Sequence, residues 1–246
     1  ITHVKGKELD RIRDKMQMVF QDPYSSLNPR IRIESTIKEP LKHSGRFHGK
    51  SEIQAEADRL MELVGIDERL RQSYPHELDG GRRQRVGIAR ALALNPEFIV
   101  CDEPVSALDV SIQAQVLNLL MDLQEKMGVA YMFVTHDLSV VRHISNHICV
   151  MYLGQLVEKA PTEELFLHTL HPYTKALLSA IPSTDIFHPM QRVQLKGEIT
   201  SPIDPEPGCR FAARCPYATE ACKQPQKLTE VEPGHFVSCC RVKEIK

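Results

Sequence analysis

The stretch Phe98-Ile99-Val100-Cys101-Asp102-Glu103 decides the fold. Its four consecutive apolar residues predict a short strand buried on both faces, as in a parallel sheet. An amphipathic helix is expected over residues 111–127 and a second buried strand over 129–134, so the chain alternates strand, helix and strand. Two carboxylates follow the first strand directly, at the carboxyl edge where open α/β sheets bind ligands. The sequence therefore predicts an α/β fold with a ligand site at this edge.

Asp102 and Glu103 have the form of a Walker B element, in which a strand ends in two carboxylates. In that chemistry the first carboxylate holds Mg²⁺ through water, and the second polarises the water that attacks a γ-phosphorus atom. Acidic residues at the end of a strand are more often solvated loop positions. The hexapeptide by itself leaves both interpretations open.

Four further elements occur around this strand in a fixed order. Gln21 leads a turn-rich loop, Asp79-Gly80-Gly81-Arg82-Arg83-Gln84-Arg85 lies upstream of the strand, and Ser106-Ala107-Leu108-Asp109 and Thr135-His136-Asp137 lie downstream. The set resembles the nucleotide-binding domain of ABC transporters over nearly all of residues 16–159. This resemblance implies a P-loop NTPase-like ABC ATPase domain over residues 1–181, with a helical subdomain at about 28–94.

The resemblance also implies a role for each matching residue, with ATP and Mg²⁺ as cofactors. Glu103 would be the catalytic base, His136 the switch histidine, and Gln21 the Q-loop glutamine. Asp102 would hold Mg²⁺, and Asp109 would belong to the D-loop. Asp79, Gly80 and Gly81 would form the signature element, which grips the γ-phosphate of ATP held by the opposite subunit through the N-terminus of a helix.

Asp79 departs from the family pattern, which usually has Ser at this position. As a helix cap Asp equals Ser, so a neutral exchange of caps is one interpretation. The other is an impaired composite site, because a carboxylate about 4 Å from a phosphate charge is repelled by about 4 kcal/mol at an effective dielectric constant of about 20 and about 1 kcal/mol in water. We expect impairment, partly offset by Arg82.

A phosphate-binding loop of the pattern Gly, four residues, Gly-Lys-Ser/Thr does not occur in the sequence. The segment Gly45-Arg46-Phe47-His48-Gly49-Lys50-Ser51 has three residues between its glycines and no strand before it. We expect it to be a loop leading to a helix capped by a Ser51 and Gln54 capping box. The resemblance places the true loop before Gln21, so we expect a preceding N-terminal part outside this sequence and weak or no ATP binding by residues 1–246 alone.

Two segments point to the transported substrate. Gln21-Asp22-Pro23-Tyr24-Ser25-Ser26-Leu27-Asn28-Pro29 and His171-Pro172-Tyr173-Thr174-Lys175-Ala176-Leu177-Leu178 resemble the ATPase subunits of dipeptide and oligopeptide importers, the first being nearer to the second of their two paralogous subunits. The implied partners are a paralogous ATPase subunit in a heterodimer, two membrane permease subunits reached through the surface at residues 24–28, and indirectly a peptide-binding protein. Nickel importers share much of this pattern.

Composition narrows the function classes only slightly. Lys plus Arg (31) nearly cancels Asp plus Glu (32), which gives no argument for a nucleic-acid partner. No run reaches the roughly 18 apolar residues of a membrane span, so we expect a peripheral protein on the cytoplasmic face of the cell membrane. ABC-type ATPases of DNA repair or translation would show a long coiled-coil insert or a tandem repeat, and the sequence has neither. A non-catalytic or degenerate subunit stays open.

Residues 182–246 are expected to form a C-terminal extension that carries five of the seven cysteines. Such a short, proline-rich segment builds little core, and four thiolates on a metal would supply stability. The proposed ligands are Cys209, Cys215, Cys222 and Cys239, with Cys240 as a spare. The resemblance to the peptide-importer extension implies a four-iron four-sulfur cluster, while zinc and unligated thiols stay open.

Overall fold

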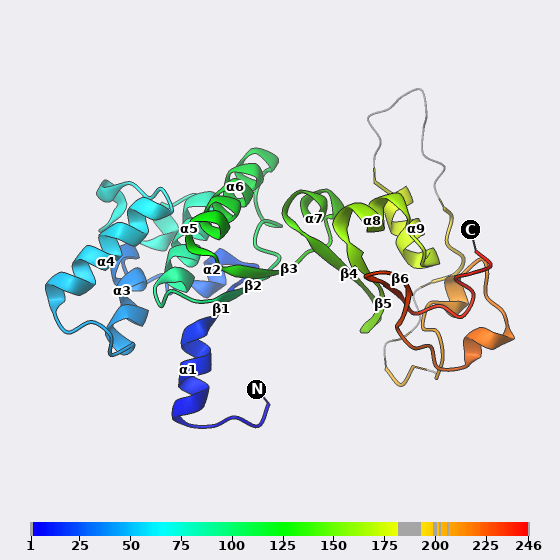
Figure 1. Ribbon diagram of the computed structural model, residues 1–246. Helices are drawn as coiled ribbons and strands as arrows, with labels where there is room; N and C mark the ends of the chain where they lie inside the picture. The colour runs from blue at the N-terminus through cyan, green and yellow to red at the C-terminus, as the bar shows by residue number, and fades with distance from the viewer. Residues whose placement is uncertain (1, 182–192, 199–200, 202, 206, 246) are drawn as a thin grey trace. The chain divides into compact units, whose positions relative to one another are not determined.

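A computed structural model describes residues 2–181, 193–198, 201, 203–205 and 207–245 (Figure 1). The chain forms two compact units, Ile1–His136 and Asp137–Lys246. The domain boundary expected near Ile181 is a different division, and it stays a prediction. It adjoins residues 182–192, which lie outside the described residues. Within the described residues, no helix combines the length and apolar composition needed to cross a membrane.

The first unit is built on a three-stranded parallel sheet with the order β1-β2-β3. Its strands are β1 (Met16–Val19), β2 (Phe98–Asp102) and β3 (Ala130–Val134), and α6 (Val110–Met127) connects β2 to β3. The parallel register aligns Val19 with Cys101 and Asp102 with Val134, so all three strands end at one edge. The predicted α/β alternation is confirmed.

Strand β3 exists where it was predicted, but the prediction that it is buried is wrong. It lies at the edge of the sheet, and its side chains Met132 and Val134 are 53% and 40% exposed. An apolar run indicates that a strand belongs to a sheet, but it does not indicate how many neighbours that strand has.

Helices supply the rest of the first unit. They are α1 (Lys7–Lys15), α2 (Pro23–Ser26), α3 (Ile33–His43), α4 (Lys50–Leu63) and α5 (Gly80–Leu92), with 3-10 turns at Glu68–Leu70 and Pro75–Glu77. Helices α3, α4 and α5 contact one another, and their facing side chains Ile37, Leu60 and Ile88 are fully buried. Residues 33–92 therefore contain a helical layer, and the subdomain bounds of about 28–94 stay a prediction.

The start of α4 corrects one local prediction. The cap is Gly49, and the helix begins at Lys50, so Ser51 lies inside the helix and the predicted Ser51–Gln54 capping box is wrong. Glu52 instead accepts a hydrogen bond from the backbone N–H of His48 at 2.9 Å, while Gln54 contacts Lys38 and Asp58. Gln54 belongs to a polar cluster between α3 and α4, and the local sequence pattern does not predict these contacts.

The second unit contains an antiparallel sheet with the order β4-β5-β7-β6. Its elements are α7 (Leu138–Ile144), β4 (His147–Tyr152), β5 (Gln155–Pro161), α8 (Thr162–Leu167), α9 (Pro172–Ser179), 3-10 turns at Ala212–Arg214 and Glu220–Lys223, β6 (Thr229–Glu232) and β7 (His235–Val237). Glu158 of β5 pairs with Val237 of β7. The cysteine-bearing extension thus shares a sheet with β4 and β5.

Aromatic packing also ties the extension to the rest of this unit. Phe211 is only 1% exposed, and its ring lies 5.3 Å from those of both Tyr152 and Tyr173. Aromatic pairs at such distances contribute about 0.5–1.5 kcal/mol beyond the burial of their area. The extension therefore does not depend on a core of its own, because it inserts Phe211 into the core formed by β4, β5 and α9.

Candidate functional site

Glu103 occupies a strained backbone position directly after β2. Its φ angle is 43°, in the left-handed region that few residues other than glycine adopt. The position is held on both sides, because its N–H donates to the carbonyl of Val134 at 2.9 Å and its own carbonyl accepts from the Ser106 hydroxyl at 3.1 Å. Strain that the surroundings enforce is characteristic of functional positions.

Three of the predicted site residues meet at the carboxyl ends of the three parallel strands. Gln21 Nε2 donates to Glu103 Oε2 at 2.7 Å, and His136 Nδ1 lies 3.0 Å from Glu103 Oε1. An ionised carboxylate only accepts hydrogen bonds, so in this arrangement His136 carries its proton on Nδ1 and leaves Nε2 for a ligand. The parallel register brings residues together that lie 82 and 33 positions apart in sequence.

The two predicted aspartates of this edge have different surroundings. Asp102 is the half-buried last residue of β2, directly before Glu103. Asp109 is the N-cap of α6 and accepts from the Ile112 N–H at 3.0 Å and from the Ser111 hydroxyl at 2.8 Å. These hydrogen bonds to the charged form lower the pKa of Asp109. Asp109 thus has a structural role as a cap, whatever else it does.

Asp79 caps α5 as the sequence predicts. Its Oδ1 accepts from the Arg82 N–H at 2.8 Å, and its Oδ2 lies 3.4 Å from the Arg82 guanidinium. Both side chains are more than half exposed, so this ion pair contributes little stability. The guanidinium nonetheless places a positive charge beside the carboxylate that replaces the usual serine.

Gly80 and Gly81 have a packing role that the sequence did not indicate. A Cβ atom on Gly81 would overlap Ile112 Cγ2, and one on Gly80 would lie 2.9 Å from Leu108 Cδ2. The start of α5 therefore approaches the start of α6 too closely for any larger residue at position 81. Gly81 therefore has a packing role independent of any ligand, whereas at Gly80 the Leu108 side chain could move aside.

Tyr24 is an exposed aromatic residue of the surface expected to face membrane subunits. Its side chain is 55% exposed and lies under the Arg83 guanidinium, which is 3.9 Å from the ring centroid. Arg83 is fixed in turn by two hydrogen bonds to the Leu78 carbonyl, at 2.9 and 2.7 Å. Leu27 is only 1% exposed, so not every residue of the 24–28 segment is available to a partner.

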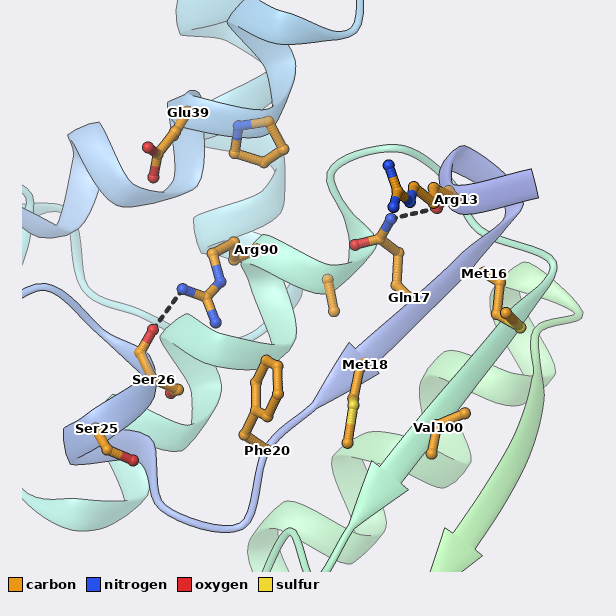
Figure 2. Close-up of a pocket in the computed structure, with 12 residues that line it drawn as sticks. Arg13, Met16, Gln17, Met18, Phe20, Ser25, Ser26, Glu39, Arg90 and Val100 are labelled. Atoms are coloured by element: carbon orange, nitrogen blue, oxygen red, sulfur yellow. Dashed lines mark hydrogen bonds between the residues drawn. The ribbon is translucent and has the colours of Figure 1, made fainter. Parts of the chain in front are cut away.

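A cavity of about 870 Å³ lies beside β1, as Figure 2 shows. Met18 and Phe20 contribute apolar surface to this cavity. Arg90 Nη1 donates a hydrogen bond to the Ser26 carbonyl at 2.6 Å. Its lining does not include Gln21, Glu103 or His136. The cavity is therefore separate from the carboxylate set.

The predicted cysteine ligands lie in the second unit and influence one another. Burial first, and then the neighbouring Cys222, Cys239 and Cys215, together raise the pKa of Cys209 to about 11. Cys222 Sγ lies 3.9 Å from Cys240 Sγ. Cys240 was predicted to be the spare residue, so this contact brings a fifth thiol to the group.

A buried polar network in the second unit had no signal in the sequence. Glu158 and His235 are fully buried, and Glu158 Oε1 lies 2.8 Å from His235 Nε2. Glu158 also accepts from the backbone N–H groups of Leu170 at 2.8 Å and His171 at 3.1 Å. A carboxylate within an apparently ordinary strand and a histidine 77 positions later show no spacing pattern.

Comparisons with known proteins agree with this architecture. Residues 1–106 match the ABC transporter family, and residues 157–222 match the oligopeptide/dipeptide transporter C-terminal region. In structure, the chain resembles CbiO1 from Clostridium perfringens, part of an ABC transporter complex, with a TM-score of 0.61, 26% identity and coverage of 67% of this chain and 64% of that one. A dimeric ATP-binding cassette bound to ADP and Pi gives a TM-score of 0.58, 31% identity and coverage of 65% and 68%. The fold and site thus define an ABC ATPase.

The curated relatives narrow the class further. The putative oligopeptide transport ATP-binding protein YkfD of Bacillus subtilis is 50% identical over 236 residues, which cover 95% of this chain and 72% of the relative. AppF, an oligopeptide transport ATP-binding protein of the same organism, is 51% identical over 93% of this chain and 70% of its own length. The dipeptide transport ATP-binding protein DppF of Haemophilus influenzae is 48% identical over 94% and 70%. The chain belongs to the family of oligopeptide and dipeptide transport ATP-binding proteins.

Proposed function

We propose that this chain is the ATP-hydrolysing subunit of an importer of dipeptides or oligopeptides, bound peripherally at the cytoplasmic face of the membrane. The observation that carries the proposal is the Glu103 carboxylate, held at the end of β2 between Gln21 and His136. Family membership supports the same activity, because the relatives are named for oligopeptide or dipeptide transport.

In the proposed mechanism Glu103 polarises the water that attacks the γ-phosphorus atom of ATP. Gln21 and His136 each hold one oxygen of this carboxylate, which fixes its orientation before the substrate arrives. His136 Nε2 is then the nitrogen available to the γ-phosphate. Asp102, directly before Glu103, is the carboxylate that would hold Mg²⁺ through water, and the ion would neutralise phosphate charge.

The signature residues act, on this proposal, on ATP held by a paralogous subunit. The first N–H groups of α5 have no partner within the helix, so this N-terminus suits a phosphate. Gly80 and Gly81 let the helix begin close to α6, and Asp79 places a carboxylate at the same end. Two membrane permease subunits would receive the motion through the surface at Tyr24, and a peptide-binding protein would deliver the substrate.

The test is peptide uptake by cells in which the chromosomal copy carries Glu103→Gln. Loss of the water-polarising carboxylate lowers the chemical step by about 10²–10⁴-fold, so uptake of a labelled dipeptide and a labelled pentapeptide is expected to stop. The matched control is Glu97→Gln, at the residue directly before the same strand, where an exposed ion pair with Lys15 is lost at little cost. Normal uptake in the Glu103→Gln cells contradicts the assigned role. Wild-type cells that import neither peptide through this system contradict the peptide substrate.

We further propose that Cys209, Cys215, Cys222 and Cys239 hold a four-iron four-sulfur cluster. The proposal rests on likeness to the peptide-importer extension, since residues 157–222 match the oligopeptide/dipeptide transporter C-terminal region. Zinc on the same thiols is the alternative. When bound, the cluster would crosslink segments of the extension.

Protein purified without oxygen tests the cluster. We expect a brown colour and roughly four irons per chain, both lost in Cys215→Ser. Cys149→Ser is the control, because this exposed thiol lies on β4 and outside the group. Comparing Cys239→Ser with Cys240→Ser identifies the fourth ligand. Colourless protein with stoichiometric zinc contradicts the cluster and keeps a metal site, whereas metal-free protein contradicts both.

A further inference from the structure

The buried histidine His235 uses only one of its two ring nitrogens within the protein. Nε2 lies 2.8 Å from Glu158 Oε1, and Glu158 is fixed by the backbone N–H groups of Leu170 and His171. Nδ1 is buried and has no hydrogen-bond partner. Because a carboxylate accepts, Nε2 carries the proton and Nδ1 presents a lone pair. A lone pair buried without a partner is costly, and a ligand at Nδ1 would remove that cost.

Two carboxylates lie beside this histidine. The ligand atoms of Glu164, Glu232 and His235 all lie within 4.8 Å of one another, and no other such group was found in the part of the chain that the structure describes. Glu232 and His235 are opposite residues of the β6–β7 hairpin, so their side chains share a face. Glu164 comes from α8, more than sixty positions away in sequence.

We propose that Glu164, Glu232 and His235 bind a divalent transition-metal ion of the zinc type. One imidazole nitrogen and two carboxylate oxygens form a three-ligand set with a fourth position left for water. Glu158 is the positioning residue, because metal-binding histidines almost always donate their other N–H to a carboxylate or carbonyl. The site is separate in chemistry from the thiol group, since its donors are nitrogen and oxygen only.

The distances are compatible with binding after a small movement. Ligand atoms on a tetrahedral zinc ion lie about 3.4 Å apart, since the Zn–N and Zn–O distances are about 2.0–2.2 Å. The present upper limit of 4.8 Å therefore requires a contraction of about 1.4 Å at most. Glu232 is exposed, so a change of its side-chain rotamer would supply this movement. Glu164 Oε1 contacts His168 Nδ1 at 2.8 Å, so the metal would take the other carboxylate oxygen or replace His168.

An ion at this place would join α8 to the β6–β7 hairpin. The hairpin is the segment through which the C-terminal extension enters the sheet, by pairing of β7 with β5. A cavity of about 500 Å³ is lined by Glu232 and His168, and so opens to one of the three proposed ligands. The inferred role is a metal clip for the extension, which does not depend on ATP hydrolysis.

The test is a titration of the full chain with zinc and with cobalt, comparing wild type with Glu232→Gln and Glu164→Gln. Loss of one carboxylate ligand is expected to weaken zinc at this site by at least tenfold. Glu163→Gln is the matched control, since it removes an exposed charge from the same helix and should leave the isotherm unchanged. Mg²⁺ should not compete, because an imidazole-containing site of this kind disfavours it.

Cobalt distinguishes this site from the cysteines. The wild-type spectrum minus that of Glu232→Gln should show d–d bands without a thiolate charge-transfer band. A thiolate band in this difference spectrum would assign the ion to the cysteines and overturn the proposal. Identical zinc isotherms for wild type and Glu232→Gln would also overturn the proposal. Because Glu232 is exposed, this variant keeps the test valid even if Glu164→Gln disturbs α8.

Discussion

The fully buried Glu158 carboxylate predicts a large loss of stability on Glu158→Gln. It accepts three hydrogen bonds, from His235 Nε2 and from the backbone N–H groups of Leu170 and His171. These partners belong to β7 and to the segment that begins α9, so the carboxylate joins three parts of the second unit. Glutamine has nearly the same shape, which makes the substitution a test of the acceptor and not of volume.

The magnitude follows from the geometry of the two oxygens. Oε1 accepts from Leu170 and His235, and Oε2 accepts from His171. In either orientation the glutamine NH₂ group faces at least one backbone N–H, which loses its acceptor in a site without solvent. A hydrogen bond to a charged group contributes about 1.5–3 kcal/mol, and an unsatisfied buried donor costs about 1–3 kcal/mol. Because these costs overlap, we expect a loss of about 2–4 kcal/mol.

Urea denaturation of the full chain, in chelator so that metal does not contribute, measures this loss. Glu163→Gln on α8 is the control, because its ion pair with Arg142 is exposed and its removal should change the free energy of unfolding by less than about 0.5 kcal/mol. A Glu158→Gln variant as stable as this control would refute the reasoning. It would mean that the carboxylate contributes no more than an amide at the same place.

Three further outcomes follow from the geometry. Burial lowers the pKa of His171 from 6.5 to about 4, so as the pH falls from 6.5 only the unfolded chain takes up this proton, and the free energy of unfolding should fall by up to about 1.4 kcal/mol per pH unit. His171→Asn keeps a capping acceptor for α9 and should flatten the pH profile of urea denaturation. An unchanged pH profile contradicts the assignment. Gly81→Ala should lower the free energy of unfolding, measured in urea, by about 1–3 kcal/mol because the new Cβ meets Ile112. In Gly80→Ala the new Cβ meets only a movable methyl group, so the loss should be smaller. Equal losses in the two variants would disprove the packing argument. Asp79→Ser should leave the free energy of unfolding unchanged, because serine caps a helix as well as aspartate does. It should raise the ATPase rate of the assembled importer about fivefold or more, which corresponds to removing about 1 kcal/mol of repulsion between carboxylate and phosphate. An unchanged rate would mean that Asp79 acts only as a helix cap.

Local chemistry explains why much of the first unit was predictable. The apolar run ending in Asp102 and Glu103 predicted β2, and Asp79 was placed correctly at a helix start because short polar side chains cap N–H groups nearby in sequence. Ser51 failed as a cap because Gln54, its expected partner, has better polar contacts across the α3–α4 interface. Those contacts come from residues that the local pattern does not include.

The sequence alone determined the parallel strands, the fixed order of the nucleotide-site elements and therefore the family, since these depend on neighbours along the chain. Only the tertiary structure decided that β7 joins β5, that Phe211 fills the core beside Tyr152, and that Glu158 meets His235. The physical reason is range, because strand formation depends on residues close together in sequence, whereas the pairing of a buried charge depends on which distant segment supplies its donors. A carboxylate in β5 looks like a solvated residue until the fold surrounds it.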